Sequence, residues 1–212
     1  MKSESSFGLG VFLRAPRLGT VKTRLARDVG AAAALAAYQR LLARTLDAIA
    51  SLPCVDLCGT PDDALPELEP WRRPGWTLSP QGPGNLGDRL HRAFARWLGA
   101  PHARWVVIGT DCPELTPGDI QAAWQALDQA EVVLGPATDG GYWLLGLKAP
   151  APDLFREIPW GGPEVLQMTR DRAASLGRRV ALLRELRDVD TAADWQAFQS
   201  REPFPEPSKE LC

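Results

Sequence analysis

Short apolar runs alternate with longer segments of helical periodicity along most of the chain. The apolar runs are bounded by turn residues, which is typical of buried β-strands. They fall at residues 7–13, 55–59, 76–79, 104–109, 131–137, 141–147 and 180–183. We expect helices at residues 29–52, 85–99 and 163–176, after Thr116, and from Thr191 onward. Strands that alternate with helices predict an α/β protein built on a layered sheet.

The segment between the strands at 131–137 and 141–147 predicts a departure from a purely parallel sheet. Its sequence, TDGG, has a composition suited to a tight reversal. We therefore expect an antiparallel excursion in this region. Ligands of such sheets lie outside the carboxyl ends of the strands. The polar, glycine-containing motifs of this chain follow expected strands, which places them at that edge.

Length and composition fit a globular protein with one main domain. The chain has 212 residues, of which 45% are hydrophobic and 24% charged. We expect a single domain over residues 1–200 and a flexible tail over residues 201–212. The formal net charge of −2 argues against a general nucleic-acid-binding protein, which needs excess positive charge.

Neither the N-terminus nor the cysteines indicate export. The apolar run at residues 7–13 is too short for a signal peptide or a membrane span. Four cysteines and two histidines form no CxxC pair and no close cluster. Structural zinc and a disulfide framework are therefore not expected. These features predict a cytoplasmic protein without membrane insertion.

A burst of positive charge follows the first expected strand. After Gly19, the segment GTVKTRLA presents Lys22 and Arg24. A helix that opens near Gly19 and Thr20 would point free N–H groups at an anion, and the two cations would add charge-assisted hydrogen bonds. The spacing is not that of a P-loop. An ordinary helix start with a solvated basic face is the alternative interpretation.

Asp111 lies just beyond the expected strand at residues 104–109, the clearest buried strand of the chain, in the segment VVIGTDCPEL. A carboxylate held there, at the binding edge of the sheet, could share a hard cation such as Mg²⁺ or Mn²⁺ with substrate phosphates. A turn or capping role before Pro113 is the alternative. Cys112 is better explained as a small packed residue than as a nucleophile, because no histidine lies near it in sequence.

Three further aspartates fall in candidate positions. Asp139 lies in the TDGG turn, where glycines allow close approach of a ligand, although Asp-Gly is also a common hairpin signal. Asp188 and Asp190 are two residues apart and share one face if the segment is extended, which would complete a cation site. Asp190 could equally cap the helix expected from Thr191.

Two other segments combine glycine with polar or aromatic residues. QGPGNLGDRL is a glycine-rich loop before a helix, and its Asp88 and Arg89 would either close over a ligand or cap the helix. Trp160 precedes a Gly-Gly corner and is a candidate acceptor-site aromatic residue. Tyr142 could stack on a sugar or base. For both aromatic residues, packing in the core is the alternative.

Several of these segments, in this order, resemble one known family. They are GTVKTRLA, NLGDRL, GTDCPEL, GPATDGGYWLLGL, IPWGGPEVLQMT and DVDTAADW, within residues 7–199. They are similar to the DUF2064 family of bacterial proteins, assigned as glycosyltransferases of the nucleotide-diphospho-sugar transferase superfamily. The resemblance implies the glycosyltransferase-A fold, a Rossmann-like three-layer α/β/α arrangement around a mixed sheet. Arg14 stands where a lysine is usual, and Gly161 and Gly162 replace a Ser/Thr pair.

Taken with this resemblance, the motifs give each candidate residue a role. Nucleotide or phosphate binding is expected of Arg14, Gly19, Lys22, Arg24, Gly87 and Arg89. Substrate binding is expected of Gly140, Gly141, Tyr142 and Trp160. Catalysis is expected of Asp111 and Asp139, and binding of a Mg²⁺ or Mn²⁺ ion of Asp111, Asp188 and Asp190.

The superfamily contains two chemistries, and both remain open. In a glycosyltransferase, metal on Asp111 would neutralise the diphosphate leaving group while Asp139 activates the acceptor hydroxyl. In a nucleotidyltransferase, Lys22 and Arg24 would hold a triphosphate, and metal on Asp111 and Asp190 would promote attack by a phosphorylated substrate. A non-catalytic nucleotide-binding protein is the third candidate. The expected partners are a nucleotide or nucleotide-sugar and a small-molecule acceptor, with a homodimer among the open assembly states.

Overall fold

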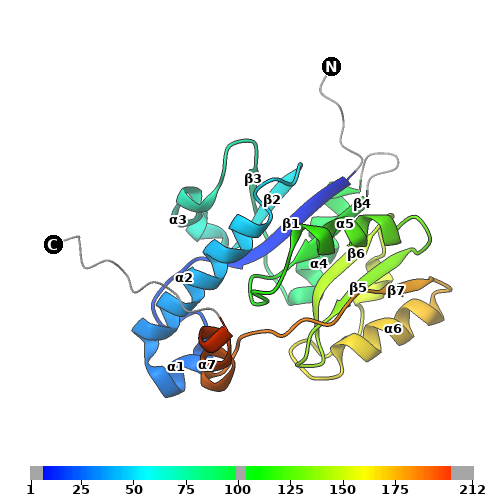
Figure 1. The fold of residues 1–212 in the computed structure, drawn as a ribbon. Helices are drawn as coiled ribbons and strands as arrows, with labels where there is room; N and C mark the ends of the chain where they lie inside the picture. Colours follow the sequence, from blue (N-terminus) through cyan, green and yellow to red (C-terminus); the bar gives the residue numbers. More distant parts are fainter. Residues whose placement is uncertain (1–6, 99–103, 202–212) are drawn as a thin grey trace.

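The described residues form a seven-stranded sheet through the centre of the molecule (Figure 1). The computed structural model describes residues 7–98 and 104–201. The strands are β1 (Phe7–Arg14), β2 (Val55–Thr60), β3 (Thr77–Pro80), β4 (Arg104–Ile108), β5 (Val132–Pro136), β6 (Tyr142–Leu147) and β7 (Val180–Leu182). Their order is β3-β2-β1-β4-β6-β5-β7. Only β6 runs antiparallel to its neighbours within this sheet, which confirms the expected excursion.

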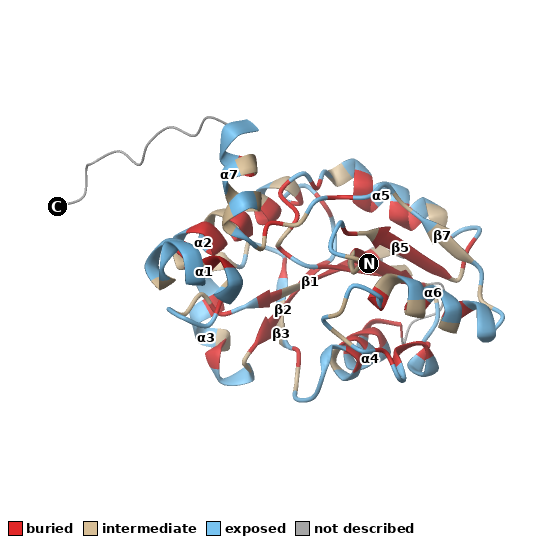
Figure 2. Cartoon of the chain, turned by 90° about the horizontal axis from the view of Figure 1, so that it is seen from below, coloured by how far each residue is buried: buried red, intermediate tan, exposed pale blue. Residues whose placement is uncertain are grey.

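Helices cover both faces of the sheet. The longer ones are α1 (Thr23–Val29), α2 (Ala31–Ala48), α4 (Leu86–Trp97), α5 (Pro117–Ala126), α6 (Val165–Ser175) and α7 (Ala192–Arg201). Figure 2 shows α2 and α5 on one face and α4 and α6 on the other. The two largest clusters of buried side chains divide in the same way. The predicted three-layer α/β/α arrangement around a mixed sheet is confirmed.

The sequence of β1 explains how one strand serves both layers. Leu9 and Val11 are fully buried in the cluster beneath α2 and α5. Gly10 has the opposite orientation, and a Cβ atom there would lie only 2.1 Å from the ring of Trp97. That indole in turn stacks on Trp105 of β4, with ring centroids 4.6 Å apart. Glycine at alternate positions of the strand thus makes room for tryptophans on the α4 side.

The first helical region differs from the prediction. The sequence predicts a helix over residues 29–52, and the structure has α2 in this region, which Gly30 separates from the preceding α1. Gly30 adopts a φ of +84°, which ends one helix and redirects the chain before the next. The second helix ends at Ala48, because the chain turns ahead of Pro53.

The proline-rich stretch after β2, which has no clear helical or strand periodicity in the sequence, is regular in the structure. It consists of consecutive short helical turns, with α3 (Leu65–Leu68) between 3₁₀ turns at Asp62–Ala64 and Glu69–Trp71. Proline falls in the first turn of α3, where its missing N–H has no helical partner to lose. A further 3₁₀ turn, at Pro152–Phe155, was also not predicted.

The described residues end with the last helix, where the predicted tail begins. The final helix, expected from Thr191, is α7, and it extends to Arg201. Residues 202–212 lie outside the described residues, so the tail and the domain division remain predictions. Across residues 7–98 and 104–201, no helix combines the length and apolar character needed to cross a membrane.

A buried carboxylate links β2 to β3 and α4. Asp56 of β2 is only 3% exposed. Its Oδ1 accepts hydrogen bonds from the hydroxyls of Thr77 and Ser79 at 2.8 and 2.9 Å. Its Oδ2 accepts from the indole of Trp97 at 2.9 Å and from the guanidinium of Arg96 at 3.2 Å. These donors compensate for the removal of the carboxylate from water.

We expect Asp56→Ala to lower the free energy of unfolding by about 1–3 kcal/mol, because it leaves the buried indole N–H of Trp97 without an acceptor. Urea denaturation of the two proteins measures the difference. Asp63→Ala is the matched control, since the Asp63 side chain is 77% exposed. Its effect should stay within about 0.5 kcal/mol. Equal losses in the two variants would contradict a structural role for Asp56.

Candidate functional site

A wide groove with positively charged walls opens at the carboxyl ends of β1 and β2. Its volume is about 770 Å³. The charged side chains that line it are Arg14, Lys22, Arg24 and Arg89, with the carboxylates Asp111 and Asp190. The neutral polar ones are Thr20, Thr23, Tyr38, Thr60, Gln81, Asn85 and Thr110. The excess of cations and the many hydrogen-bonding groups suit a polar anion.

Arg89 is held in the groove wall by neutral partners. Its helix, α4, begins with a capping box in which Asn85 and Asp88 each accept a hydrogen bond from the other's backbone N–H. Arg89 donates to Thr60 Oγ1 and Gln81 Oε1, both at 3.2 Å. Because these partners carry no charge, they orient the guanidinium without neutralising it. Asp88 therefore caps the helix, which leaves Arg89 as the charged group that faces the groove.

Lys22 lies between the groove and two carboxylates. Its side chain is only 4% exposed, and Nζ is 2.5 Å from Asp111 Oδ1 and 3.1 Å from Asp190 Oδ1. Nζ also donates to Val189 O at 2.6 Å. Burial would lower the pKa of Lys22, but the two carboxylates outweigh it and raise that pKa. The ammonium therefore stays charged at physiological pH.

The backbone of Lys22 is strained. Its φ of +47° and ψ of +47° are left-handed values that cost a non-glycine residue about 1–2 kcal/mol. The ion contacts described above are the compensation at this position. Strain of this kind is common at functional sites.

The first helix begins later than predicted. The sequence suggested an opening near Gly19 and Thr20, whereas α1 starts at Thr23. Gly19 has a φ of +76° and does not line the groove. The side chains of Lys22 and Arg24, rather than a helix terminus at Gly19, supply the positive charge at this end of the groove.

A second, smaller cavity lies beside the groove. Its volume is about 210 Å³. Much of its lining is apolar or aromatic and includes Leu115, Ala137, Tyr142, Trp143, Trp160 and Val165. Its charged side chains are Asp111, Asp139, Asp188 and Asp190. Leu86, Asp111 and Asp190 line both spaces, so the groove and the cavity meet at the Lys22 ion cluster.

Close packing fixes the aromatic wall of the cavity. A Cβ atom on Gly87 of α4 would lie 2.8 Å from Trp160 Nε1. The Trp160 and Tyr142 rings meet edge to face, with centroids 6.5 Å apart. Gly140 approaches the same loop, and a Cβ atom there would lie 2.0 Å from Pro163 O. Neither glycine lines the groove or the cavity, so the geometry gives Gly87 and Gly140 packing positions in place of the predicted ligand contacts.

Asp139 and Asp188 contribute carboxylates to the cavity wall. Asp139 Oδ1 accepts a hydrogen bond from Gly141 N at 2.8 Å, which closes the TDGG turn. Asp188 Oδ1 accepts one from the Thr138 hydroxyl at 3.1 Å. Burial and the neighbouring charge of Asp139 raise the pKa of Asp188. This side of the cavity therefore concentrates negative charge.

Cys112 also lines the cavity, and its environment opposes reactivity. The side chain is buried, and burial raises the pKa of the thiol well above its usual value. A thiol that stays protonated is a poor nucleophile. This environment agrees with the interpretation of Cys112 as a small packed residue.

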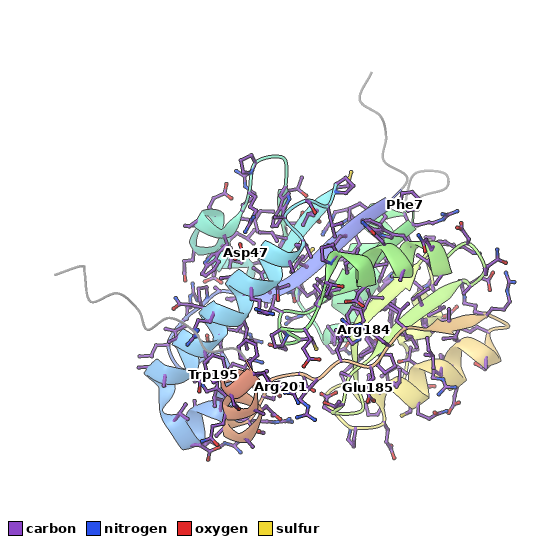
Figure 3. The ribbon with its side chains drawn as sticks, viewed as in Figure 1. Phe7, Asp47, Arg184, Glu185, Trp195 and Arg201 are labelled. Carbon is purple, nitrogen blue, oxygen red and sulfur yellow. The ribbon has the colours of Figure 1, made fainter. Side chains whose placement is uncertain are left out.

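The segment between β7 and α7 brings two of the predicted metal ligands to the site. It crosses the lower half of the molecule in Figure 1, in orange, from β7 to α7, and Figure 3 labels Arg184 and Glu185 on it. Arg184 donates to both carboxylate oxygens of Asp119, at 2.6 and 2.8 Å. Further along, Val189 N donates to Asp111 O at 3.0 Å. These contacts hold the segment against α5 and the loop after β4.

The structure brings most of the predicted site residues together. Those at the groove are Arg14, Lys22, Arg24 and Arg89; those at the cavity are Asp139, Gly141, Tyr142, Trp160 and Asp188; Asp111 and Asp190 line both. The alternative that Asp190 caps the last helix is wrong. Asp190 pairs with Lys22 and Arg24, whereas Asp194 accepts hydrogen bonds from Thr191 at the start of α7.

Two residues that shape the groove were missed. The Tyr38 hydroxyl accepts from Arg14 N at 2.9 Å and donates to Arg14 O at 2.8 Å. Gln81 is 5% exposed and donates to Leu13 O and Cys58 O. The only signal in the sequence was a polar residue in an apolar segment, such as the tyrosine within the alanine- and leucine-rich α2. The hydrogen-bond partners of both residues lie too far along the chain for sequence spacing to reveal them.

The carboxylates suit a hard divalent cation in their chemistry, although they do not form a ready ligand cage. Asp111, Asp188 and Asp190 all line the cavity, and carboxylate oxygens are preferred ligands of Mg²⁺ and Mn²⁺. In the described part of the chain, however, no three acidic, cysteine or histidine side chains converge as a metal-binding group. The ammonium of Lys22 lies between Asp111 and Asp190 instead.

Comparison with known proteins agrees with the sequence motifs. The sequence profile of DUF2064, described as uncharacterized protein conserved in bacteria, matches residues 45–162. The chain belongs to the DUF2064 family. A solved structure described as a candidate nucleotide-diphospho-sugar transferase, from Desulfovibrio desulfuricans G20, is 31% identical to this DUF2064 protein. The match covers 96% of this chain and 92% of that one, with a TM-score of 0.85.

More distant structures share the fold of this DUF2064 protein. A CMP:2-keto-3-deoxy-manno-octonic acid synthetase complexed with CTP is 12% identical, covering 93% of this chain and 98% of that one, with a TM-score of 0.57. A Mycobacterium tuberculosis protein in complex with manganese is 18% identical, covering 92% and 98%, with a TM-score of 0.53. Together with the Desulfovibrio structure, they confirm the nucleotide-diphospho-sugar transferase fold. A search among curated proteins finds no match.

The contact between Arg184 and Asp119 predicts a defined dependence of stability on pH. Burial would raise the pKa of Asp119, but hydrogen bonds from Arg184 and Thr116 lower it overall. An aspartate with a lowered folded-state pKa stabilises the fold above its unfolded pKa of about 3.9. That contribution is lost as the pH falls from there towards the folded pKa. Asp119→Asn should therefore reduce stability at pH 7 and flatten the loss in acid.

Urea denaturation of wild type and Asp119→Asn at a series of pH values tests this prediction. We expect Asp119→Asn to lower the free energy of unfolding by about 1–2 kcal/mol at pH 7. This loss is smaller than for a fully buried ion pair, because the Arg184 side chain is half exposed and water screens its charge. Glu185→Gln, at an exposed neighbour of Arg184, is the control and should leave the curve unchanged. Parallel pH curves for wild type and Asp119→Asn would disprove the role of this contact.

Proposed function

We propose that this protein is a transferase that takes a nucleotide-activated sugar as donor and a small molecule as acceptor, with the help of a divalent cation. The observation that carries the proposal is the meeting of two unlike spaces at Lys22, Asp111 and Asp190. The groove is large, polar and rich in cations, whereas the cavity is small, aromatic and acidic. A transferase needs two such adjacent sites, since donor and acceptor must meet.

The groove is the proposed donor site. Lys22, Arg24 and Arg89 would donate hydrogen bonds to the phosphates, and such charge-assisted bonds are strong. Arg14 lies at the end of β1, and Tyr38 fixes its backbone on both sides. The Desulfovibrio relative, described as a candidate nucleotide-diphospho-sugar transferase, supports a nucleotide-linked donor in this space.

Asp111, Asp188 and Asp190 are the proposed ligands of a Mg²⁺ or Mn²⁺ ion, which when bound offsets the charge of the diphosphate leaving group. Lys22 would then turn from these carboxylates to the phosphates. The manganese complex of the Mycobacterium tuberculosis protein supports a divalent cation on this fold.

The cavity is the proposed acceptor site, and Asp139 is the proposed base. One oxygen of Asp139 accepts a hydrogen bond from Gly141 N, which orients the carboxylate. In the transfer, the acceptor oxygen bonds to the anomeric carbon of the donor sugar, and the bond from that carbon to the diphosphate oxygen breaks. The acceptor proton passes to Asp139, and the nucleoside diphosphate leaves through the groove.

Nucleotidyl transfer is the second candidate function. The four cations of the groove favour it, because a nucleoside triphosphate carries more negative charge than a nucleotide-sugar. The CTP-bound synthetase has the same fold and supports this alternative. Analysis of the products decides between the two: a nucleotide-sugar donor yields a nucleoside diphosphate, whereas nucleotidyl transfer releases pyrophosphate. Nucleotide binding without turnover would support the third candidate, a non-catalytic nucleotide-binding protein.

The cytoplasm remains the proposed location of the protein, on the evidence of the sequence.

Removal of the Lys22 charge should weaken nucleotide binding. A ligand present at about 100 times its Kd stabilises the folded state by about 2.7 kcal/mol, which raises Tm on the order of 5–10 °C for a chain of this size. Thermal shifts with nucleoside triphosphates and nucleotide-sugars should show such a rise for one ligand class in wild type. Lys22→Ala should weaken that ligand about 10- to 100-fold, as expected for a lost charged hydrogen bond.

Arg17→Ala is the matched control for this experiment. Arg17 belongs to the same loop, but its guanidinium pairs with Glu67 and does not line the groove. Each variant is compared with its own ligand-free Tm, so a change in intrinsic stability does not enter the comparison. If Lys22→Ala and Arg17→Ala retain the same nucleotide affinity, the groove is not the phosphate site.

Loss of one carboxylate should remove the effect of metal on nucleotide binding. In wild type, Mg²⁺ or Mn²⁺ should increase the thermal shift produced by the preferred nucleotide. Asp111→Asn should abolish this increase, because the amide lacks the charge that binds a hard cation. Glu114→Gln, at an exposed carboxylate three residues along the chain, should keep it. A metal-dependent increase that survives in Asp111→Asn would contradict the proposed cation site.

A further inference from the structure

The cavity beside the groove has an unusual charge distribution. Among the described residues that line it, four are aspartates and none is a lysine, arginine or histidine. The adjoining groove has the opposite balance, with four cations and two carboxylates. The change from positive to negative walls occurs across the Lys22 ion cluster. An anionic group placed in the cavity would therefore meet only like charges from its lining side chains.

The rest of the cavity wall suits the apolar face of a small molecule. Trp160 is fixed by its contacts with Gly87 and Tyr142, so its orientation is set before any ligand binds. At about 210 Å³, the space is smaller than the roughly 300–1,000 Å³ pockets that take drug-sized ligands. One sugar-sized or smaller group is the scale that fits.

A bound cation would not reverse the negative charge of the cavity. Lys22 and Arg24 each contribute one positive charge at the boundary, and a divalent cation on Asp111, Asp188 and Asp190 would contribute two. Together they would offset the four carboxylates in the wall without making its summed charge positive. The diphosphate of the donor then adds negative charge on the groove side. The electrostatic selection against anions in the cavity is therefore strongest without the metal, and with the metal bound it is restored by the charge of the donor diphosphate.

We propose that the acceptor of this enzyme is a small neutral or cationic alcohol or amine, and that the four aspartates exclude acceptors that carry a phosphate or carboxylate. The inference rests on the proposed function, since it takes the cavity as the acceptor site. It narrows the substrate class to polyols, amino alcohols and amino sugars. It also disfavours nucleotidyl transfer to a phosphorylated second substrate.

Ligand-observed NMR tests the inference with two series of probes that are similar in size within each series but differ in charge. One series is glucose, glucosamine, glucuronate and glucose 6-phosphate, and the other is glycerol, serinol, glycerate and glycerol 3-phosphate. We expect the neutral and cationic members of at least one series to bind, and the anionic members to bind at least about tenfold more weakly. The experiment is run with and without Mg²⁺, and the difference in affinity between the neutral and the anionic members should be larger without the metal.

Two kinds of variant connect the binding to the cavity. Val165→Phe should fill the space and abolish probe binding, and Gly162→Phe is the second variant if the first fails to fold, since a Cβ there meets only Pro159 O, at 3.5 Å. Asp188→Asn should reduce the preference for cationic over anionic probes about fivefold or more. Glu185→Gln, which is exposed and does not line the cavity, should leave that preference unchanged.

Either of two results overturns the inference. One is cavity binding of glucose 6-phosphate or glycerol 3-phosphate as tight as that of the neutral parent. The other is the absence of cavity binding by every neutral and cationic probe. Neither depends on the nucleotide thermal shifts, which test the proposed function in the groove. If no nucleotide produces a thermal shift but the cavity still binds neutral and cationic probes in preference to anionic ones, the transferase proposal is overturned and the charge selectivity of the cavity stands.

Discussion

The buried ammonium of Lys22 joins three parts of the chain that are distant in sequence. It contacts Asp111 after β4, and Asp190 and Val189 before α7. A buried charge without partners costs several kcal/mol, so the ammonium can occupy this position only when both carboxylates are present. Formation of the first loop and arrival of the C-terminal segment are therefore coupled. The same contact that completes the fold also assembles the candidate site.

Hydrogen-bonded pairs away from the ligand-binding spaces support the segments that carry this cluster. The Lys22 backbone is strained and Asp111 is half exposed, whereas Arg184 and Asp119 form a two-bond pair away from the groove. Asp56 is fully hydrogen-bonded on the other side of the sheet. These hydrogen-bonded pairs hold the segments that carry the ionic groups. The ionic groups themselves can then exchange partners when a ligand arrives.

The sequence reveals the sheet better than it reveals the site. Strand patterns and the TDGG turn are local signals, so the mixed sheet could be predicted from them. The break between α1 and α2 depends on one left-handed glycine, Gly30, which periodicity does not register. Gly87 and Gly140 resemble ligand-contacting glycines in sequence, but each faces a bulky group from a distant segment. The pairing of Lys22 with Asp111 likewise depends on the three-dimensional arrangement of two loops.

Shared carboxylates connect the two halves of the site energetically. Lys22 cannot neutralise Asp111 and Asp190 and also bind a phosphate at full strength, because its three N–H donors already contact these two carboxylates and Val189 O. When Lys22 turns to a phosphate, the two carboxylates lose their partner. A divalent cation then becomes favourable at the position that the ammonium leaves. Nucleotide and cation should thus strengthen each other's binding equally, since coupling between two sites is reciprocal.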